Sequence, residues 1–155
     1  MRRSALPLTI VIALAAALPA SAQDAAAFRQ CVAGEARSGV AESYAICAAP
    51  LAQPCASSAT AKEAAGCIDA ARHQVAGWVE AGASALADRR SEPLSEVMDD
   101  LNVIADGGAA ACAAMADNDR RSGVATGQRA VNAAFCGLVA TADVYAALIG
   151  LEDVE

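Results

Sequence analysis

The sequence predicts an all-α fold, a small antiparallel helical bundle stapled by up to three disulfides. Apolar residues recur at three-to-four spacing through several long segments, which is the pattern of one buried helix face. No stretch alternates between apolar and polar residues for long, so we expect no sheet. The chain also contains six cysteines, and an even set is typical of a disulfide framework in an oxidising compartment.

The clearest predicted helix spans residues 61–88. Thr60 and Glu63 fit a capping box at its start, in which the threonine oxygen accepts a bond from a helix amide and the glutamate reaches back. Apolar residues then keep helical spacing at Ile68, Ala71, Val75, Trp78 or Val79, Gly82 and Leu86. Trp78, the only tryptophan, is expected to be a core residue; the alternative is an anchor for a binding partner.

Two shorter helices are expected before the long one. The first spans residues 24–35 and is broken by Gly39. The second spans residues 41–49 and is ended by Pro50 and Pro54, because proline lacks the amide that a helix interior needs.

After the long helix, Ser91 and Pro93 are expected to restart the chain as an N-cap followed by an early helical proline. Helical spacing continues over residues 94–108, up to a Gly-Gly pair, and residues 109–116 are either a separate turn or a kinked continuation. A charged loop is predicted over residues 117–127. The last helix follows, with apolar residues from Val131 to Ile149 and then an acidic tail over residues 152–155.

Residues 1–22 have the features of a cleavable export signal. Arg2 and Arg3 form a positive start, residues 5–18 are apolar, and Ala-Ser-Ala is an A-x-A cleavage site before Gln23. The alternative is an uncleaved anchor, but an apolar run of about 14 residues is shorter than the roughly 20 that a spanning helix needs. We therefore expect a bacterial protein that is periplasmic or secreted, with residues 23–155 as a single domain.

The expected mature chain is acidic. Without Arg2 and Arg3, 9 of the 11 basic residues remain against 18 acidic ones, a net charge of about −9. This balance argues against nucleic acid, which is bound through Lys and Arg, and against an anionic membrane surface after signal cleavage. It favours association with a basic protein; the alternative is a surface that is merely solvated.

The six cysteines allow 15 pairings, and the sequence alone does not select one. Pairing of sequence neighbours is our first expectation, because each such pair brackets a turn signal. The expected pairs are Cys31–Cys47, Cys55–Cys67 and Cys112–Cys136. A closed loop of around 15 residues contributes roughly 3 kcal/mol on the loop-entropy model. This matters here because only 3% of the residues are aromatic and alanine side chains bury little area.

No metal, cofactor or catalytic site is expected, and the chain is predicted not to be an enzyme. Short C-x₂₋₄-C hooks for zinc and a C-x-x-C redox motif are absent from the sequence, as are a G-x-S-x-G elbow and a phosphate loop. The only histidine, His73, follows Asp69 by four residues, which on a helix predicts a surface ion pair. Two acidic pairs, Glu92 with Glu96 and Asp99-Asp100, are expected to face solvent or to diverge.

The order of the cysteines and a few residues between them resembles a known family. The matching run is Cys47, Cys55, Thr60, Gly66-Cys67 and Trp78, then Cys112 and Cys136 followed by an apolar helix ending at Leu148. It resembles the LprI-like lysozyme inhibitor family of small, exported, helical envelope proteins. The chain departs from the family at Val79, where an aspartate is usual, and no Leu-Asn-x-x-Tyr segment follows. It also has Ile104 and Gly108 where a tryptophan and an arginine are usual.

The resemblance implies an exported, non-catalytic binding protein that acts on a basic cell-wall hydrolase of the lysozyme type. An acidic, disulfide-stapled bundle suits this role physically, because it would be attracted to a basic enzyme and pre-organised for it. The loop at residues 117–127 is a candidate contact region. The alternative is a periplasmic helical protein with a structural or chaperone-like interaction and no inhibitory activity.

Overall fold

The computed structural model describes residues 20–38 and 44–152, and all regular structure within these ranges is helical. The elements are α1 (Ala20–Ser38), α2 (Ala45–Ala52), the 3₁₀ helix η1 (Gln53–Ser57), α3 (Ala61–Arg90), α4 (Leu94–Arg121) and α5 (Thr126–Glu152). The predicted all-α, disulfide-stapled bundle is confirmed. Most of the predicted signal segment lies outside the described residues, and α1 begins at Ala20, ahead of the expected mature start at Gln23.

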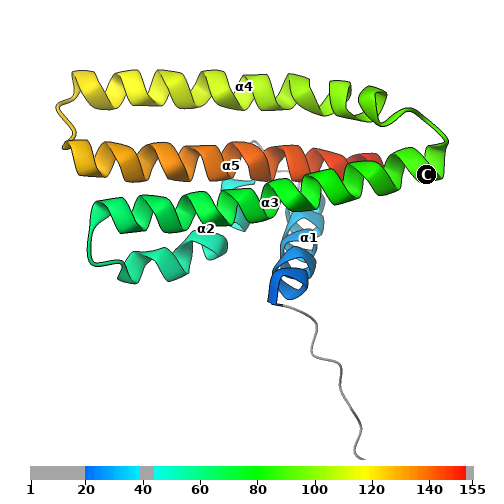
Figure 1. Ribbon diagram of the computed structural model, residues 1–155, viewed down its shortest axis with the longest axis horizontal. Helices are drawn as coiled ribbons and strands as arrows, with labels where there is room; N and C mark the ends of the chain where they lie inside the picture. Colours follow the sequence, from blue (N-terminus) through cyan, green and yellow to red (C-terminus); the bar gives the residue numbers. More distant parts are fainter. Residues whose placement is uncertain (1–19, 39–43, 153–155) are drawn as a thin grey trace, which may run out of the picture.

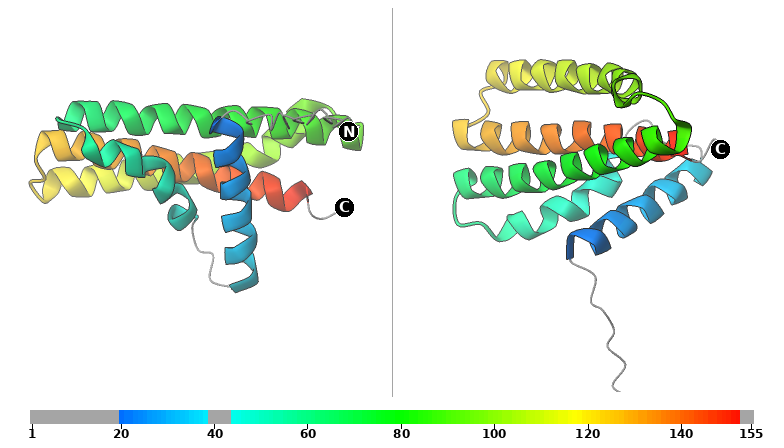
Figure 2. Two further views of the ribbon diagram at one scale, coloured as in Figure 1. Left: turned by 90° about the horizontal axis from the view of Figure 1, so that it is seen from below. Right: turned by 45° about the vertical axis from the view of Figure 1, so that its right-hand side comes forward.

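Three long helices form the body of the molecule, with α5 between α3 and α4 (Figure 1). α4 runs antiparallel to both of its neighbours, so α3 and α5 run parallel to each other. α1 and α2 pack on the side of α3 and α5 that faces away from α4, and α1 crosses the long helices steeply (Figure 2). α4 therefore packs mainly on α5 and is the least covered of the long helices.

α5 is the centre of the core and contacts all four of the other α-helices. By length and composition alone, this helix is apolar enough to cross a membrane. In the bundle, however, Leu138, Ala142 and Leu148 have no exposed surface, and Tyr145 is 3% exposed. Burial against the other helices therefore accounts for the apolar residues on one face of α5, since 39% of its apolar window is buried.

The start and end of α3 are set by local hydrogen bonds. The capping box is confirmed, because the Glu63 amide donates to Thr60 Oγ1 at 3.2 Å and the Thr60 amide donates to Glu63 Oε2 at 3.0 Å. At the other end, Ser91 is left-handed with φ of 55°, and the Glu92 amide bonds the Ala87 carbonyl. The prediction that Ser91 caps α4 is wrong; it ends α3, and Pro93 holds the N-cap position of α4.

Of the two alternatives for residues 109–116, a separate turn or a continuation, the structure shows the continuation: α4 runs through the Gly107-Gly108 pair to Arg121. A Cβ atom added at Gly108 would lie 2.7 Å from the Cβ of Ala140 on α5. Glycine is therefore needed for close approach of two helices, and the packing gained offsets its low helix propensity.

The predicted charged loop at residues 117–127 is also wrong over most of its length. Only residues 122–125 connect α4 to α5, and Gly123, with φ of 70°, makes the turn. Asp117 pairs with Arg120 one turn later on α4. Asp119 is buried and accepts a 2.7 Å hydrogen bond from Asn132 Nδ2 of α5. Side-chain bonds of this kind keep the charged residues within helices.

The predictions for the two prolines, Pro50 and Pro54, and for the acidic tail also need correction. Pro50 lies inside α2, which continues to Ala52, and Pro54 then lies early in η1. A proline in the last turn of a short helix removes only one backbone bond, so the helix tolerates it. Glu152 is not part of a free acidic tail, because it belongs to α5 and pairs with Arg29 and Arg89; residues 153–155 lie outside the described ranges.

α1 is held to the body by aromatic, ionic and covalent contacts. The rings of Phe28 (α1), Trp78 (α3) and Tyr145 (α5) form a cluster with centroid distances of 5.5–6.3 Å. The core position predicted for Trp78 is confirmed. Arg29 donates to Glu152 at 2.5 Å and to the Tyr145 hydroxyl at 2.9 Å, and the bond to Glu152 raises its pKa.

All three expected disulfides are present. They are Cys31–Cys47, Cys55–Cys67 and Cys112–Cys136, with no free cysteine among the described residues. The first ties α1 to α2, the second ties η1 to α3, and the third ties α4 to α5. Each staple therefore joins consecutive elements across their connection.

Asp143 of α5 accepts a 2.9 Å hydrogen bond from the Tyr44 amide at the start of α2. Its burial raises the pKa of the carboxyl group, and the bond from Tyr44 opposes the rise. A raised folded-state pKa means that the stability contributed by this group is largest at acid pH, below its ordinary value, and is lost as the pH rises through the folded value.

Asp143→Asn is therefore expected to keep or raise stability at pH 7, because asparagine retains the acceptor and removes the buried charge. The gain should disappear as the pH falls, since the wild-type carboxyl then becomes neutral too. Thermal melts at neutral and acid pH measure this difference. Asp143→Ala is the control and should lose about 1 kcal/mol, because it leaves the Tyr44 amide without its acceptor. A loss at pH 7 as large in the Asn variant as in the Ala variant would contradict the prediction.

Candidate functional site: the acidic face of α4 and the adjoining groove

α4 exposes more of its surface than the other two long helices. Its buried residues are only Val97, Leu101 and Asp119, although the helix runs for 28 residues. The reason lies in the packing, because α4 rests on α5 alone along most of its length. Most of its side chains therefore remain available to a partner.

The exposed part of α4 carries a one-sided charge. The chain has no Lys, Arg or His between Arg90 and Arg120, and this interval holds Glu92, Glu96, Asp99, Asp100, Asp106, Asp117 and Asp119. Two of these are compensated within the bundle, since Asp117 pairs with Arg120 and Asp119 bonds Asn132. For the other five, all exposed, no ion pair occurs within the described part of the chain.

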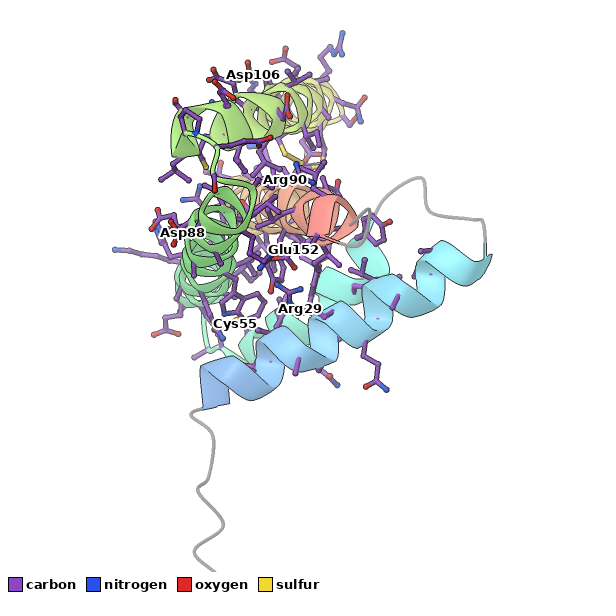
Figure 3. The ribbon with its side chains drawn as sticks, turned by 90° about the vertical axis from the view of Figure 1, so that its right-hand side faces the viewer. Arg29, Cys55, Asp88, Arg90, Asp106 and Glu152 are labelled. Atoms are coloured by element: carbon purple, nitrogen blue, oxygen red, sulfur yellow. A yellow bond between two sulfur atoms is a disulfide. The ribbon has the colours of Figure 1, made fainter. Side chains whose placement is uncertain are left out.

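An apolar side chain lies in the middle of these acidic residues. Val103 is 74% exposed, and the helical positions around it, three or four residues away, hold Asp99, Asp100 and Asp106. Glu96 lies two turns earlier on the same side. We call Glu96, Asp99, Asp100, Val103 and Asp106 the acidic face of α4. In Figure 3, Asp106 points outward from α4, away from α5.

The chemistry of this face suits recognition of another protein better than catalysis. Its carboxylates are exposed, and none is confined in a pocket among the described residues. Charges of one sign steer an oppositely charged partner, and an exposed apolar centre supplies area that can be desolvated on contact.

Beside the acidic face, α3, α4 and α5 enclose an open groove of about 370 Å³. Its lining is mostly small and apolar: Ala76 and Val79 of α3; Met98, Leu101, Ala105, Ala109 and Cys112 of α4; Gly137, Ala140 and Val144 of α5. The groove exists because α3 and α4 touch each other little while both pack on α5. Its size is at the lower end of the range for ligand sites in proteins.

Four polar residues complete the lining of the groove. They are Arg72 and Glu80 from α3, Asn102 from α4 and Thr141 from α5. The charge of Arg72 is balanced, because Asp69 lies 2.8 Å from its guanidinium. Thr141 bonds the Gly137 carbonyl of its own helix. Glu80 therefore leaves the rim of the groove with an acidic character.

The residues considered for acid–base chemistry do not form a site. His73 Nε2 lies 3.5 Å from Asp69 Oδ2, as the helical spacing predicts, but 69% of the His73 side chain is exposed. Glu92, Glu96 and the Asp99-Asp100 pair are on the open surface. In the part of the chain that the structure describes, no group of three or more His, Cys, Asp or Glu residues is placed to hold a metal ion.

No family model, curated protein or solved structure matches this chain.

The sequence predicts that the protein is acidic, but the acidic face of α4 was not predicted as a site. The sequence signal that could have located it is the interval without basic residues between Arg90 and Arg120. The contact region expected at residues 117–127 stays a prediction, and its first five residues belong to α4. Val103 and the groove were missed, since their exposure depends on how three helices pack.

Proposed function

We propose that this chain is an exported, non-catalytic binding protein whose acidic face of α4 binds a basic protein. The observation that carries the proposal is the set of exposed carboxylates around Val103 on the least covered helix, which form no ion pair with any residue that the structure describes. The Cys112–Cys136 disulfide fixes this helix to α5, which limits the conformational freedom that binding would otherwise have to remove. Export is expected from residues 1–22 and suits a chain with three disulfides.

A cell-wall hydrolase of the lysozyme type is the partner we propose. Support comes from the resemblance to LprI-like inhibitors, which rests on the cysteine order and on Thr60, Gly66-Cys67 and Trp78. Such hydrolases cleave sugar chains with two carboxylates in a cleft, and the common ones are basic. Two positions at which the chain departs from the family, Ile104 and Gly108, lie on α4. The contacts made here would therefore differ from those of the family.

Inhibition of wall lysis tests this proposal. The purified mature chain, added in several-fold molar excess to a basic lysozyme, is expected to slow the clearing of a cell-wall suspension. The effect should weaken as salt rises from about 0.01 M to 0.15 M, because the screening length shortens from about 30 Å to about 8 Å.

The matched variants separate α4 from total charge. Asp99→Asn with Asp100→Asn should relieve inhibition, whereas Asp24→Asn with Asp88→Asn, which removes the same charge from exposed positions on α1 and α3, should keep it. An unchanged lysis rate at a several-fold excess of the wild-type chain would refute the inhibitor role. Pull-down of a different basic protein from a periplasmic extract would then point to the structural or chaperone-like alternative.

A further inference from the structure

We infer that Gln23 becomes an amino-terminal pyroglutamate, a five-membered lactam, once the export signal has been removed. The inference rests on the export that the proposed function includes, and it goes beyond that function by assigning a modification site. Three things support it: the position of the cleavage site, the chemistry of a terminal glutamine and the way in which α1 begins.

The cleavage site determines which side chain adjoins the new amino terminus. Ala20-Ser21-Ala22 has the A-x-A pattern, so the α-amine that cleavage releases belongs to Gln23. A glutamine in this position can close an unstrained five-membered ring between its α-amine and its own side-chain amide carbon. Asparagine is one methylene shorter and would need a strained four-membered ring. The reaction is therefore specific to the residue that the sequence places at this position.

The reaction at Gln23 needs no co-reactant. The lone pair of the α-nitrogen attacks the side-chain amide carbon Cδ, and the bond from Cδ to Nε2 breaks. Nε2 takes up the proton that the α-amine loses and leaves as ammonia, so no electrons pass to an oxidant or from a reductant. The product is a neutral lactam that keeps one N–H. Because only the unprotonated amine attacks, conversion is expected to be faster at higher pH.

The start of α1 loses no backbone hydrogen bond in this reaction. The helix runs across the cleavage site, from Ala20 to Ser38, so cleavage leaves Gln23 as its first residue. The first amides of an α-helix have no acceptor within the helix, so the lactam nitrogen gives up no helical bond. A free α-ammonium would add positive charge at the positive end of the helix dipole, and the neutral lactam removes that charge. Cyclisation therefore favours the helical form of α1.

The lactam would also protect the contacts that follow it in α1. Asp24 Oδ2 accepts a 3.1 Å hydrogen bond from Gln74 Nε2 of α3. Phe28, one turn later, is 2% exposed and packs against Trp78 and Tyr145. An aminopeptidase needs a free α-amine, which pyroglutamate lacks. Cyclisation would therefore stop trimming before Asp24 and the turn that leads to Phe28 are lost.

The modified end of the chain lies away from the acidic face of α4. α1 packs on the side of α3 and α5 that faces away from α4, and its first turn is at the outer edge of that side (Figure 1). A substitution at Gln23 therefore leaves the proposed binding face unchanged. The modification can be tested separately from partner binding for this reason.

Mass spectrometry of the chain purified from the periplasm tests the inference. The intact mass is measured first, so that cyclisation on the folded protein is distinguished from cyclisation during digestion. Trypsin then cuts after Arg29 and releases the amino-terminal peptide of residues 23–29. This peptide is expected to lack the mass of one ammonia molecule and to resist stepwise amino-terminal degradation. Incubation of the intact chain at mildly alkaline pH should convert any remainder.

Gln23→Asn is the matched control variant. It keeps a carboxamide side chain beside the A-x-A site but has no route to a five-membered lactam, so its α-amine should stay free. Treated with an aminopeptidase, this variant is expected to lose residues from the start of α1. The wild-type chain, treated in the same way after incubation, should keep them.

Each other outcome identifies what has failed. A chain that begins at Gln23 and keeps its ammonia after incubation, or one that begins at another residue of α1, would overturn the inference and leave export standing. A chain from the periplasm that still carries residues 1–22 would overturn both the inference and the cleavable signal. Lysozyme inhibition, measured on the same samples, reports on the proposed partner independently of the state of Gln23.

Discussion

Removing the Cys112–Cys136 disulfide, by replacing both cysteines with alanine, is expected to lower the free energy of unfolding by about 3 kcal/mol. The two cysteines are 24 residues apart, so the bond closes a sizeable loop and restricts the unfolded chain. It is also the covalent tie between α4 and α5, and α4 has little other support from α3. Urea denaturation of the two chains measures the loss.

A second disulfide provides the control. Replacing Cys55 and Cys67 removes a bond between residues 12 apart and should cost a comparable amount of stability. That bond ties η1 to α3 and leaves α4 untouched. Binding of a basic partner should therefore weaken only when Cys112 and Cys136 are lost. Equal binding by both variants would show that the Cys112–Cys136 disulfide does not hold the acidic face of α4 in its binding position.

Gly108→Val is expected to lower the free energy of unfolding by about 2 kcal/mol, because it overpacks the contact between α4 and α5. The added Cβ would lie 2.7 Å from the Cβ and 3.4 Å from the Cα of Ala140. These atoms belong to or adjoin the backbone, so one helix must shift. A shift of α4 should also weaken partner binding, because the acidic face and one wall of the groove move with it.

The neighbouring glycine is the matched control for this prediction. A Cβ at Gly107 would meet nothing within 4 Å, and the helix propensity of the two positions changes equally. Gly107→Val should therefore stay within about 0.5 kcal/mol of wild type. Adding Ala140→Gly to the Gly108→Val variant should restore part of the lost stability, because it removes the Cβ atom that the new side chain meets. Similar losses for the two glycine variants, or no rescue by Ala140→Gly, would contradict close approach at Gly108.

The features that sequence reasoning predicted well are local ones. Thr60 and Glu63 form their capping box from bonds between residues three apart, so the pattern is readable without the fold. The cysteine pairs are close in sequence and bracket connections, and the structure joins neighbours as expected. Helical spacing predicted the long helices for the same reason, because it is a pattern of residues close together in the sequence.

Two features that the sequence did not settle depend on contacts between residues that are not close neighbours in the chain. The sequence left open whether the helix continues past Gly107-Gly108; it continues, and Gly108 serves a close approach to Ala140, which no local pattern reveals. Ser91 has the composition of an N-cap, but its left-handed conformation makes it the end of α3. Asp119 and Asn132 keep the chain helical where charged residues suggested a loop.

The candidate site, too, could be predicted only in part. Its negative charge follows from the composition, and the interval without basic residues from Arg90 to Arg120 marks where the acidic residues gather. That this segment is exposed follows only from the packing of α4 on one neighbour. The groove requires three helices in fixed relative positions, so the pattern of alanines and glycines did not predict it.

Calorimetric titration of the chain from Gln23 onward with a basic lysozyme is the most direct measurement. At low salt we expect binding at a one-to-one ratio, with an affinity at least about tenfold weaker when Asp99 and Asp100 become asparagine. The control variant, Asp24→Asn with Asp88→Asn, should bind like the wild type. No heat of binding for the wild-type chain, or an equal loss in both double variants, would contradict recognition through the acidic face of α4.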